Sequence, residues 1–138
     1  MTPEALATCH ARAFAEAGRA WSAQEFAALL DSAFVFISGD ARAFVLGRVI
    51  ADEAEVLTLA TDPDHRRNGL ARACLSAFEA AARARGATMA FLEVAEDNPP
   101  ALALYDAAGY RESARRTGYY ARSQGPKVDA LILHKTLD

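Results

Sequence analysis

A basic segment that contains a glycine lies between a predicted strand and a predicted helix, over residues 62–72. It carries three arginines, Arg66, Arg67 and Arg72. The first turn of a helix presents unpaired N–H groups and a partial positive charge, and together these bind phosphate. Gly69 lets an anion approach the backbone closely, and the arginines add cationic donors. The segment therefore predicts a phosphate site, although a charged surface turn before a helix would have the same composition.

Two familiar nucleotide motifs are excluded in this segment. No Gly-Lys-Ser/Thr follows, so it is not a Walker loop, and the third glycine of a dinucleotide-binding fingerprint is missing. His65 lies in the same segment. We interpret it as a solvated loop histidine rather than a phosphate ligand.

Two residues further along the chain are candidates for proton transfer. Glu93 stands between Leu92 and Val94 in an apolar run, where a carboxylate is costly to bury without a task or a partner. The alternative for Glu93 is an edge position that faces solvent. Tyr105 follows Ala101 at helical spacing, so it is also consistent with a core tyrosine whose hydroxyl is satisfied.

Periodicity and capping residues predict the elements that position these side chains. The predicted helices run from a Thr2-Pro3 start to Ala17, from Ser22 to about Asp31, from Leu70 to Gly86, and from an Asn98 cap to Gly109. The predicted strands cover residues 34–37, 44–50, 55–61, 89–94, 110–118 and 129–137. This order is typical of a mixed α/β sheet with helices on its faces. We expect the strand over 89–94 to be buried on both faces.

The second helix has the clearest local signal. Ser22 and Glu25 have the spacing of a capping box, and Trp21 and Phe26 flank it as a hydrophobic staple. We assign Trp21 to this staple rather than to substrate contact.

Composition sets the class of protein. The chain has 138 residues, is 52% apolar and carries a net charge of −3, which predicts one globular domain over 1–138 without a nucleic-acid footprint. Cys9 and Cys74 have no CxxC spacing, so we expect no metal site, and Cys74 is interpreted as a buried apolar residue. The sequence shows neither a signal peptide nor a membrane-length apolar run. We therefore expect a cytoplasmic protein with no membrane partner, as a monomer or a weak homodimer.

The basic segment also carries a resemblance to a known family. Arg66, Gly69 and Ala71 have the spacing Arg-x-x-Gly-x-Ala, which resembles the coenzyme A pyrophosphate motif of the GNAT acetyltransferases. Further similarities lie in the strand over 57–63, in Phe-Leu-Glu-Val at 91–94, in Asn98, in Ala-Leu-Ala-Leu-Tyr at 101–105, in Gly109-Tyr110, in Trp21-Ser22, in Arg115-Arg116, in Tyr119-Tyr120 and in Asp129-Ala130. From about Glu55 to the end, the chain closely resembles the bacterial branch that acetylates the N-terminal alanine of a ribosomal protein.

This resemblance implies a fold and a set of site residues. The fold is a mixed, mostly antiparallel twisted sheet with helices on both faces, and the cosubstrate is acetyl-coenzyme A with no metal. Glu93 would be the general base and Tyr105 the general acid. The implied coenzyme contacts are Leu59, Ala60, Thr61, Arg66, Arg67, Asn68, Gly69, Leu70, Ala71, Arg72, Asn98 and Ala101. The implied acceptor contacts are Tyr119, Tyr120 and Asp129, which are equally consistent with ordinary residues at a strand end.

Two departures from the family pattern concern the acceptor side. The family usually has a short strand before its first helix, whereas this chain opens directly into that helix. An aromatic–proline pair that often precedes the Trp-Ser box is replaced by Arg19-Ala20. Neither departure touches the coenzyme site.

The class of acceptor can be weighed from amine basicity. A protein α-amine has a pKa of about 7.7–8.0 and lysine one of about 10.4. At pH 7 roughly a tenth of α-amines are neutral, against roughly a few in ten thousand lysines, a difference of about 3.4 kcal/mol. This favours an N-terminal amine only slightly, because enzymes of this fold also acetylate lysines and small amines. The resemblance makes a protein N-terminus, for example that of a ribosomal protein, the leading acceptor. A small-molecule amine, a protein lysine, or a domain that binds acyl-coenzyme A without catalysis remain the alternatives.

Overall fold

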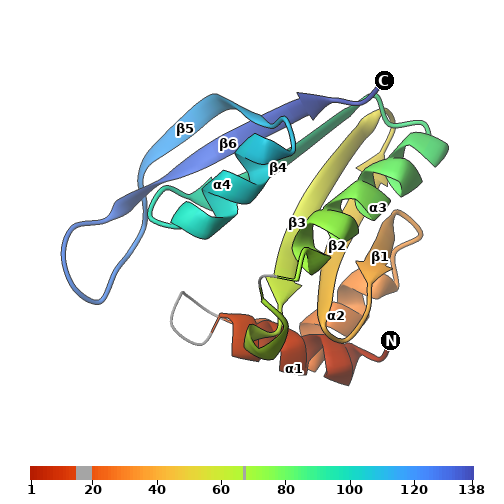
Figure 1. The fold of residues 1–138 in the computed structure, drawn as a ribbon, viewed down its shortest axis with the longest axis horizontal. Helices are drawn as coiled ribbons and strands as arrows, with labels where there is room; N and C mark the ends of the chain where they lie inside the picture. The colour runs from red at the N-terminus through yellow and green to blue at the C-terminus, as the bar shows by residue number, and fades with distance from the viewer. Residues whose placement is uncertain (15–19, 67) are drawn as a thin grey trace.

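A six-stranded sheet with four α-helices packed on it forms the part of the chain that the structure describes, residues 1–14, 20–66 and 68–138 (Figure 1). The structure is a computed structural model. Its elements are α1 (Pro3–Ala13), α2 (Ala23–Leu30), β1 (Val35–Gly39), β2 (Ala43–Ile50), β3 (Glu53–Thr61), the 3₁₀ turn η1 (Pro63–His65), α3 (Leu70–Ala84), β4 (Met89–Ala95), α4 (Pro99–Ala107), β5 (Arg111–Tyr120) and β6 (Val128–Thr136). The predicted order of helices and strands is confirmed.

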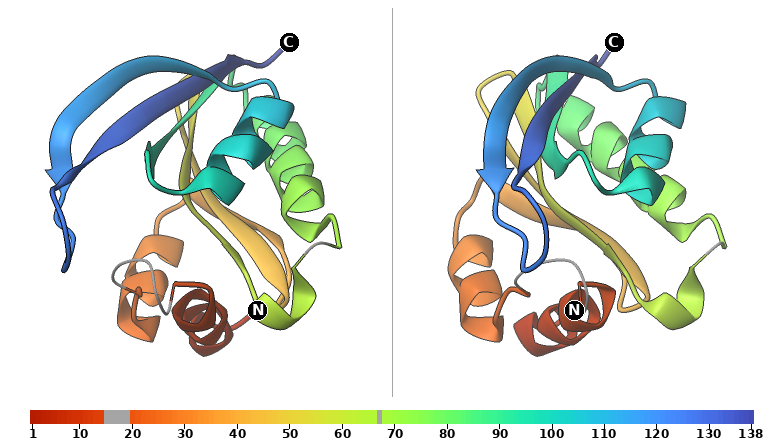
Figure 2. Two further views of the ribbon diagram at one scale, coloured as in Figure 1. Left: turned by 60° about the vertical axis from the view of Figure 1, so that its left-hand side comes forward. Right: turned by 90° about the vertical axis from the view of Figure 1, so that its left-hand side faces the viewer.

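The sheet is mixed and mostly antiparallel, as expected. Its strand order is β1-β2-β3-β4-β6-β5, and only the β3–β4 pair is parallel. Helices α1 and α2 lie on one face, and α3 and α4 lie on the other (Figure 2).

Alternation along β2 produces two separate cores. Phe44 and Leu46 point toward α1 and α2, whereas Val45 and Val49 point toward α3, because successive strand side chains face opposite sides of a sheet. All four are at most 6% exposed. Both helical layers are therefore anchored on the same central strands.

The sheet splits between its two parallel strands. Glu53–Glu55 of β3 pairs with Met89–Phe91 of β4, and the pairing goes no further. Beyond it, β3 stays paired with β2 as far as Thr61, and β4 stays paired with β6 as far as Ala95. The two strands visibly diverge in Figure 1. Because they run in the same direction, α3 and α4, which follow them, both begin at the open end of the split.

Two sequence predictions need correction. The first helix ends at Ala13 rather than Ala17: Phe14 leaves the helical conformation, and its ring stacks on His10 at 4.3 Å between centroids. The rest of the predicted helix, residues 15–17, lies outside the described residues. Strand β4 is buried on one face only, because α1 and α2 pack over β1 and β3 and leave the other face of β4 partly exposed.

The local predictions around α2 are confirmed. Ser22 and Glu25 form the capping box, and the rings of Trp21 and Phe26 lie 5.4 Å apart. Cys74 is buried in the core as expected. Within the described ranges, no helix combines the length and the apolar character that crossing a membrane requires.

Candidate active site

Helix α3 begins with backbone N–H groups that no side chain caps. Gly69 occupies the N-cap with φ +73°, and its carbonyl accepts the first helical hydrogen bond from Ala73 at 3.1 Å. A Cβ atom placed on Gly69 would meet nothing within 4 Å, so the space in front of this helix start is open. Asn68 beside it is exposed. The arrangement is that of an anion site formed by a helix N-terminus.

The loop before this helix start is held by charged groups. The Arg12 guanidinium of α1 binds Asp62 at 2.9 Å and Asp64 at 2.8 Å. Arg66 donates to the carbonyl of Ala13 at 3.2 Å, at the end of α1. The N–H of Asp64 and the Arg12 guanidinium hold the pKa of Asp62 below its usual value. The loop is thus fixed to α1 at several points.

The cations predicted for phosphate binding differ in how they are engaged. Arg72, in the first turn of α3, is exposed and has no carboxylate partner in residues 1–14, 20–66 and 68–138. Arg66 donates one hydrogen bond to the end of α1 and remains exposed. Arg67 lies outside the described residues. Arg72 is therefore the cation that is available for an anion at this helix start.

The end of β3 presents an unpaired edge to the split. The register with β2 matches Leu46 to Thr58 but Gly47 to Val56, so Leu57 is an extra residue and β3 contains a β-bulge. After it come the three residues predicted to hold the coenzyme, Leu59, Ala60 and Thr61. Leu59 packs against the core under α3, and Ala60 lies in the core under α1 and α2. Half of the backbone groups of such a strand point away from its single neighbour, here into the split.

Asn98 caps the start of α4. Its side-chain oxygen accepts the N–H of Ala101 at 3.3 Å. The amide nitrogen of the same side chain has no acceptor in the described part of the chain, so it is available as a donor. Because the N–H of Ala101 is already bonded, Ala101 can offer a ligand only its carbonyl and its methyl group.

Glu93 lies on the face of β4 that no helix covers. Its carboxylate accepts the Tyr120 hydroxyl at 3.0 Å and lies 3.4 Å from Nε of Arg116, with 28% of the side chain exposed. Burial and this hydrogen bond raise the pKa of Tyr120 to about 12. Glu93 is on an inner strand, so the predicted alternative of a sheet-edge position does not apply, but the side chain does face solvent.

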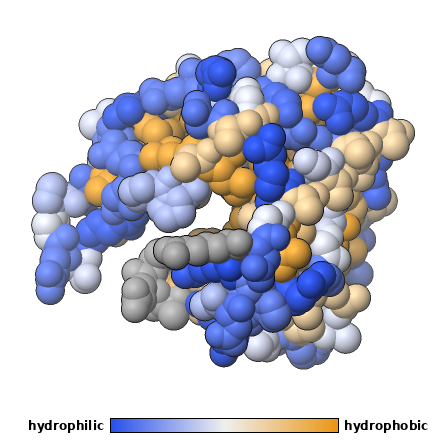
Figure 3. Space-filling view, in the orientation of Figure 1, coloured by the Kyte–Doolittle hydropathy of each residue, from blue (hydrophilic) through white to orange (hydrophobic). Residues whose placement is uncertain are grey.

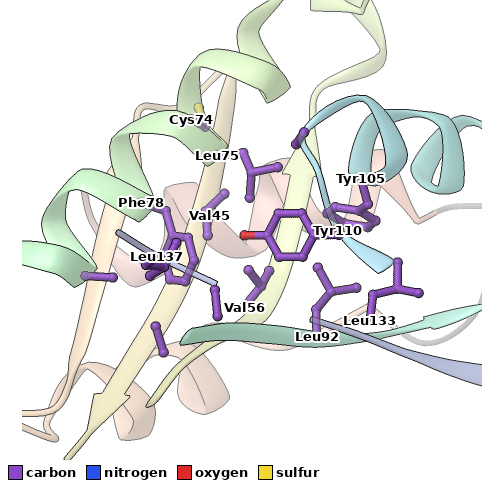
Figure 4. Packing of buried hydrophobic residues seen from close by; sticks show 14 of the residues in the cluster. Val45, Val56, Cys74, Leu75, Phe78, Leu92, Tyr105, Tyr110, Leu133 and Leu137 are labelled. Atoms are coloured by element: carbon purple, nitrogen blue, oxygen red, sulfur yellow. The ribbon is translucent and has the colours of Figure 1, made fainter. Parts of the chain in front are cut away.

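Tyr105 lies on the opposite face of the sheet, in the core beneath α4 (Figure 4). It is 6% exposed, and burial raises its pKa to about 12. The neighbouring Tyr110, whose ring is 5.9 Å away, donates its hydroxyl to Glu79 at 3.0 Å. The Tyr105 hydroxyl has no such partner among the described residues. The sequence had left open that Tyr105 is a core tyrosine with a satisfied hydroxyl. That description fits Tyr110 and not Tyr105.

The two predicted catalytic residues lie on opposite faces of the sheet. Glu93 belongs to the face of the sheet that carries α1 and α2, and Tyr105 to the face that carries α3 and α4. The space-filling view shows a deep notch between the β5–β6 hairpin with α4 and the part of the molecule that contains α1 (Figure 3).

Two shallow depressions of the surface lie away from this notch. One, of about 350 Å³, is lined by Glu53, Met89, Phe91, Ser113, Ile132 and His134. The other, of about 200 Å³, lies between the β1–β2 turn and α3. Neither contains both Glu93 and Tyr105, so the candidate site is the open split rather than an enclosed pocket.

The predicted acceptor residues are engaged to different degrees. Tyr119 is 50% exposed, and its ring contacts Tyr120 with centroids 5.1 Å apart. Asp129 accepts the N–H of Gly118 at 2.9 Å and binds Arg115 at 2.9 Å. These two contacts lower its pKa. Asp129 therefore stabilises the β5–β6 hairpin and has little capacity left for a ligand. Tyr119 and Tyr120, beside Glu93, are the predicted acceptor residues that a ligand could still contact.

Sequence reasoning missed His10. It is 1% exposed and bonds Thr58 of β3 at 3.0 Å and the N–H of Trp21 at 3.1 Å. Both partners are distant in the chain, so spacing alone gave no signal. Its position on the inner face of α1, among Leu6 and Cys9, was the available clue to burial.

Comparison with known proteins places this geometry in a family. The Acetyltransferase (GNAT) family model matches residues 3–110. The chain is 38% identical over 96 residues to the ribosomal protein bS18-alanine N-acetyltransferase of Escherichia coli, covering 70% of this chain and 64% of that protein, which is less than two thirds of its length.

Solved structures support the same assignment. The crystal structure of the ribosomal-protein-S18-alanine N-acetyltransferase from Escherichia coli superposes with a TM-score of 0.86 at 30% identity, over 99% of this chain and 88% of that one. The yncA protein of Salmonella typhimurium, solved with its cofactor acetyl-CoA, has the same fold, with a TM-score of 0.81 at 16% identity over 99% and 88% of the two chains. The family match covers most of the chain, and the superposition with the Escherichia coli enzyme covers nearly all of it. The chain therefore belongs to the GNAT acetyltransferase family.

Proposed function

We propose that this protein transfers an acetyl group from acetyl-coenzyme A to the N-terminal amine of a protein. The observation that carries the proposal is the split between β3 and β4, with Glu93 on one face and Tyr105 on the other. Acyl transfer to an amine needs a proton acceptor on the side of the amine and a proton donor on the side of the leaving thiol. A split sheet with one such group on each face supplies both.

The residues present fit coenzyme A. The open space at Gly69 and the uncapped start of α3 suit a pyrophosphate, and the unpaired Arg72 adds a cationic fork. The free edge of β3 at 59–61 suits the amide groups of the pantetheine arm, since an extended ligand can pair with an exposed strand. The amide nitrogen of Asn98, at the start of α4, adds a further donor. The coenzyme supplies the activated acyl group as a thioester.

Glu93 is the proton acceptor in this proposal. The Tyr120 hydroxyl and Arg116 hold its carboxylate on the open face of the sheet, where an amine can approach directly or through one water molecule. Tyr119 and Tyr120 form the wall beside it. An α-amine is the acceptor that suits a single carboxylate, because about a tenth of such amines are already neutral at pH 7.

Tyr105 is the hydrogen-bond donor to the leaving sulfur. With a pKa of about 12, its phenol stays protonated at neutral pH. Complete transfer of that proton to a thiolate is unfavourable, because an ordinary thiol has a lower pKa, of about 8.5. Tyr105 therefore acts mainly by donating a hydrogen bond as the carbon–sulfur bond breaks. Backbone N–H groups of β3 that point into the split polarise the thioester carbonyl.

The identity of the acceptor rests on the relatives. The Escherichia coli protein that this chain resembles is named as an N-acetyltransferase of an alanine of ribosomal protein bS18. We extend this to the present chain as the first substrate to test: a protein N-terminus led by alanine.

Mass spectrometry of a peptide panel tests the proposal. The panel holds a peptide that begins with alanine, the same peptide with a blocked N-terminus, and a peptide whose only free amine is on lysine. We expect one acetyl group, on the free alanine terminus, and a fall in kcat/KM of about 10²- to 10⁴-fold in Glu93→Gln. Acetylation of the lysine peptide alone would assign a different acceptor. Coenzyme binding without any transfer would replace the enzyme by a binding module.

A further inference from the structure

His10 joins three segments that are far apart in the sequence. It lies on α1 with its side chain fully enclosed, stacked between the rings of Phe14 at 4.3 Å and Trp21 at 5.3 Å. Its Nδ1 accepts the backbone N–H of Trp21 at 3.1 Å, so in the neutral ring the hydrogen is on Nε2. Nε2 therefore donates to the hydroxyl of Thr58, 3.0 Å away.

Thr58 belongs to the β-bulge of β3. Leu57, the extra residue, packs into the core under α1 and α2, and Thr58 next to it also faces α1 through its bond to His10. Two successive side chains thus point to one face, and the strand then resumes its alternation at Leu59, which packs on the other face. A bulge of this kind turns the backbone that follows it.

The other partner of His10 belongs to the segment before α2. The N–H of Trp21 lies one residue before Ser22, the N-cap of α2. The same imidazole therefore connects the β3 backbone next to the split with the segment that leads into α2.

We propose that His10 is a positioning residue that sets the direction of the β3 backbone at Leu59–Thr61 relative to the Trp21 segment. The proposal rests on the proposed function, since it concerns the acyl-binding edge of the split. Hydrogen bonds that stabilise a developing charge act only within about 2.7–3.1 Å. A bulge that is free to rotate loses that alignment, although the overall fold is kept.

The test removes one hydroxyl. Thr58→Val keeps the branched shape and loses the acceptor for His10, and Thr58→Ser restores the acceptor. The matched control is Thr8→Val on α1, where the hydroxyl donates to the carbonyl of Glu4 on an exposed surface. We expect kcat to fall about tenfold in Thr58→Val, with the KM for the peptide changed less than about twofold, and to recover in Thr58→Ser. Thr8→Val should match the wild type.

A second measurement does not depend on turnover. Isothermal titration with acetyl-coenzyme A and with 3′-phospho-ADP, which has the pyrophosphate but neither the pantetheine arm nor the acyl group, separates the β3 edge from the pyrophosphate site. Thr58→Val should bind acetyl-coenzyme A several-fold more weakly and leave the affinity for 3′-phospho-ADP unchanged. If the wild type acetylates no peptide but this selective loss is seen, the proposed function fails and the role of His10 stands. If Thr58→Val equals the wild type in kcat and in both affinities, the role of His10 is wrong.

A variant of His10 itself covers the case in which Thr58→Val does not fold. His10→Asn keeps an acceptor near the N–H of Trp21 and cannot reach Thr58. It should reproduce the selective loss of affinity for acetyl-coenzyme A. The fluorescence of Trp21, the single tryptophan of the chain, reports whether its environment is kept. Wild-type affinity for acetyl-coenzyme A in a folded His10→Asn protein would contradict the proposal.

Discussion

Helices α2 and α3 begin in opposite ways. At α2 the Ser22 hydroxyl accepts the N–H of Glu25, and the Glu25 carboxylate accepts the N–H of Ser22, both at 3.1 Å. At α3 the N-cap is Gly69, which offers no side chain. Helix α1 resembles α2, because Thr2 caps it at 3.1 Å. One helix start is closed by its own residues, and the other is left open to solvent.

The open start is tolerated because α3 is secured elsewhere. Leu75 and Phe78 are at most 1% exposed, and burial of such side chains contributes about 1.5–3 kcal/mol each. A side-chain cap contributes about 1 kcal/mol. The longer, better buried helix can therefore leave its first N–H groups unpaired, and unpaired N–H groups are what a phosphate binds. The difference between the two helix starts separates a structural role from a binding role.

Closing the start of α3 should have the largest effect on binding. In Gly69→Asp the new carboxylate takes the free N–H groups and repels a phosphate, so we expect affinity for acetyl-coenzyme A to fall about 100-fold, or about 3 kcal/mol. Aspartate tolerates a positive φ better than most residues, and the new cap offsets part of the strain, so the free energy of unfolding should change by less than about 1 kcal/mol. Calorimetric titration and urea unfolding measure the two quantities.

Gly125→Asp is the matched control for that variant. Gly125 has φ +82°, and a Cβ there also meets nothing within 4 Å, so charge and backbone strain change in the same way at a distant loop. Affinity for the coenzyme should stay at the wild-type value. If Gly69→Asp also keeps that affinity, α3 does not bind the pyrophosphate.

Removing the unpaired cation should have an intermediate effect. Arg72→Gln deletes one charge-assisted contact, for which we expect about tenfold weaker coenzyme binding and a shallower dependence of the affinity on salt. Stability should not change, because Arg72 has no ion-pair partner among the described residues. Arg83→Gln, in the last turn of the same helix, is the control. Equal losses in the two variants would indicate general attraction rather than a site.

Helix α4 is intermediate between the two helix starts, and Asn98 can separate its two roles. The Asn98 oxygen caps the helix, and its amide nitrogen has no acceptor among the residues that the structure describes. Asn98→Asp keeps the cap and loses the donor, so we expect coenzyme binding to weaken about fivefold while stability is retained. In Asn98→Ala both properties should fall. A stable Asn98→Asp protein with full coenzyme affinity would restrict Asn98 to capping.

The sequence was sufficient to predict a feature where the residues that form it are neighbours in the chain. The basic loop around Gly69, the capping box at Ser22 and the cap at Asn98 are local patterns, and each was found where expected. Glu93 was noticeable because its charge contrasts with its apolar neighbours. Local chemistry of this kind can be recognised before any fold is known.

Other features depend on contacts between distant segments. The split between β3 and β4 follows from register, which no single strand determines. The pairing of His10 with Thr58 spans 48 positions. Whether Tyr105 or Tyr110 has a satisfied hydroxyl depends on Glu79 of another helix. The end of α1 at Ala13 is instead a local feature, since Phe14 leaves the helical conformation.

Opening the start of α2 should have the smallest effect on binding. Ser22→Ala removes the hydroxyl that accepts the N–H of Glu25, so we expect a loss of about 1 kcal/mol in the free energy of unfolding and no change in coenzyme affinity. Because α2 is only eight residues long and buries Phe26 alone, it depends on its cap more than α3 would. Thermal unfolding and calorimetric titration measure both quantities on one preparation. A Ser22→Ala protein that binds the coenzyme more weakly would show that the two helix starts are coupled, most directly through Trp21 and His10.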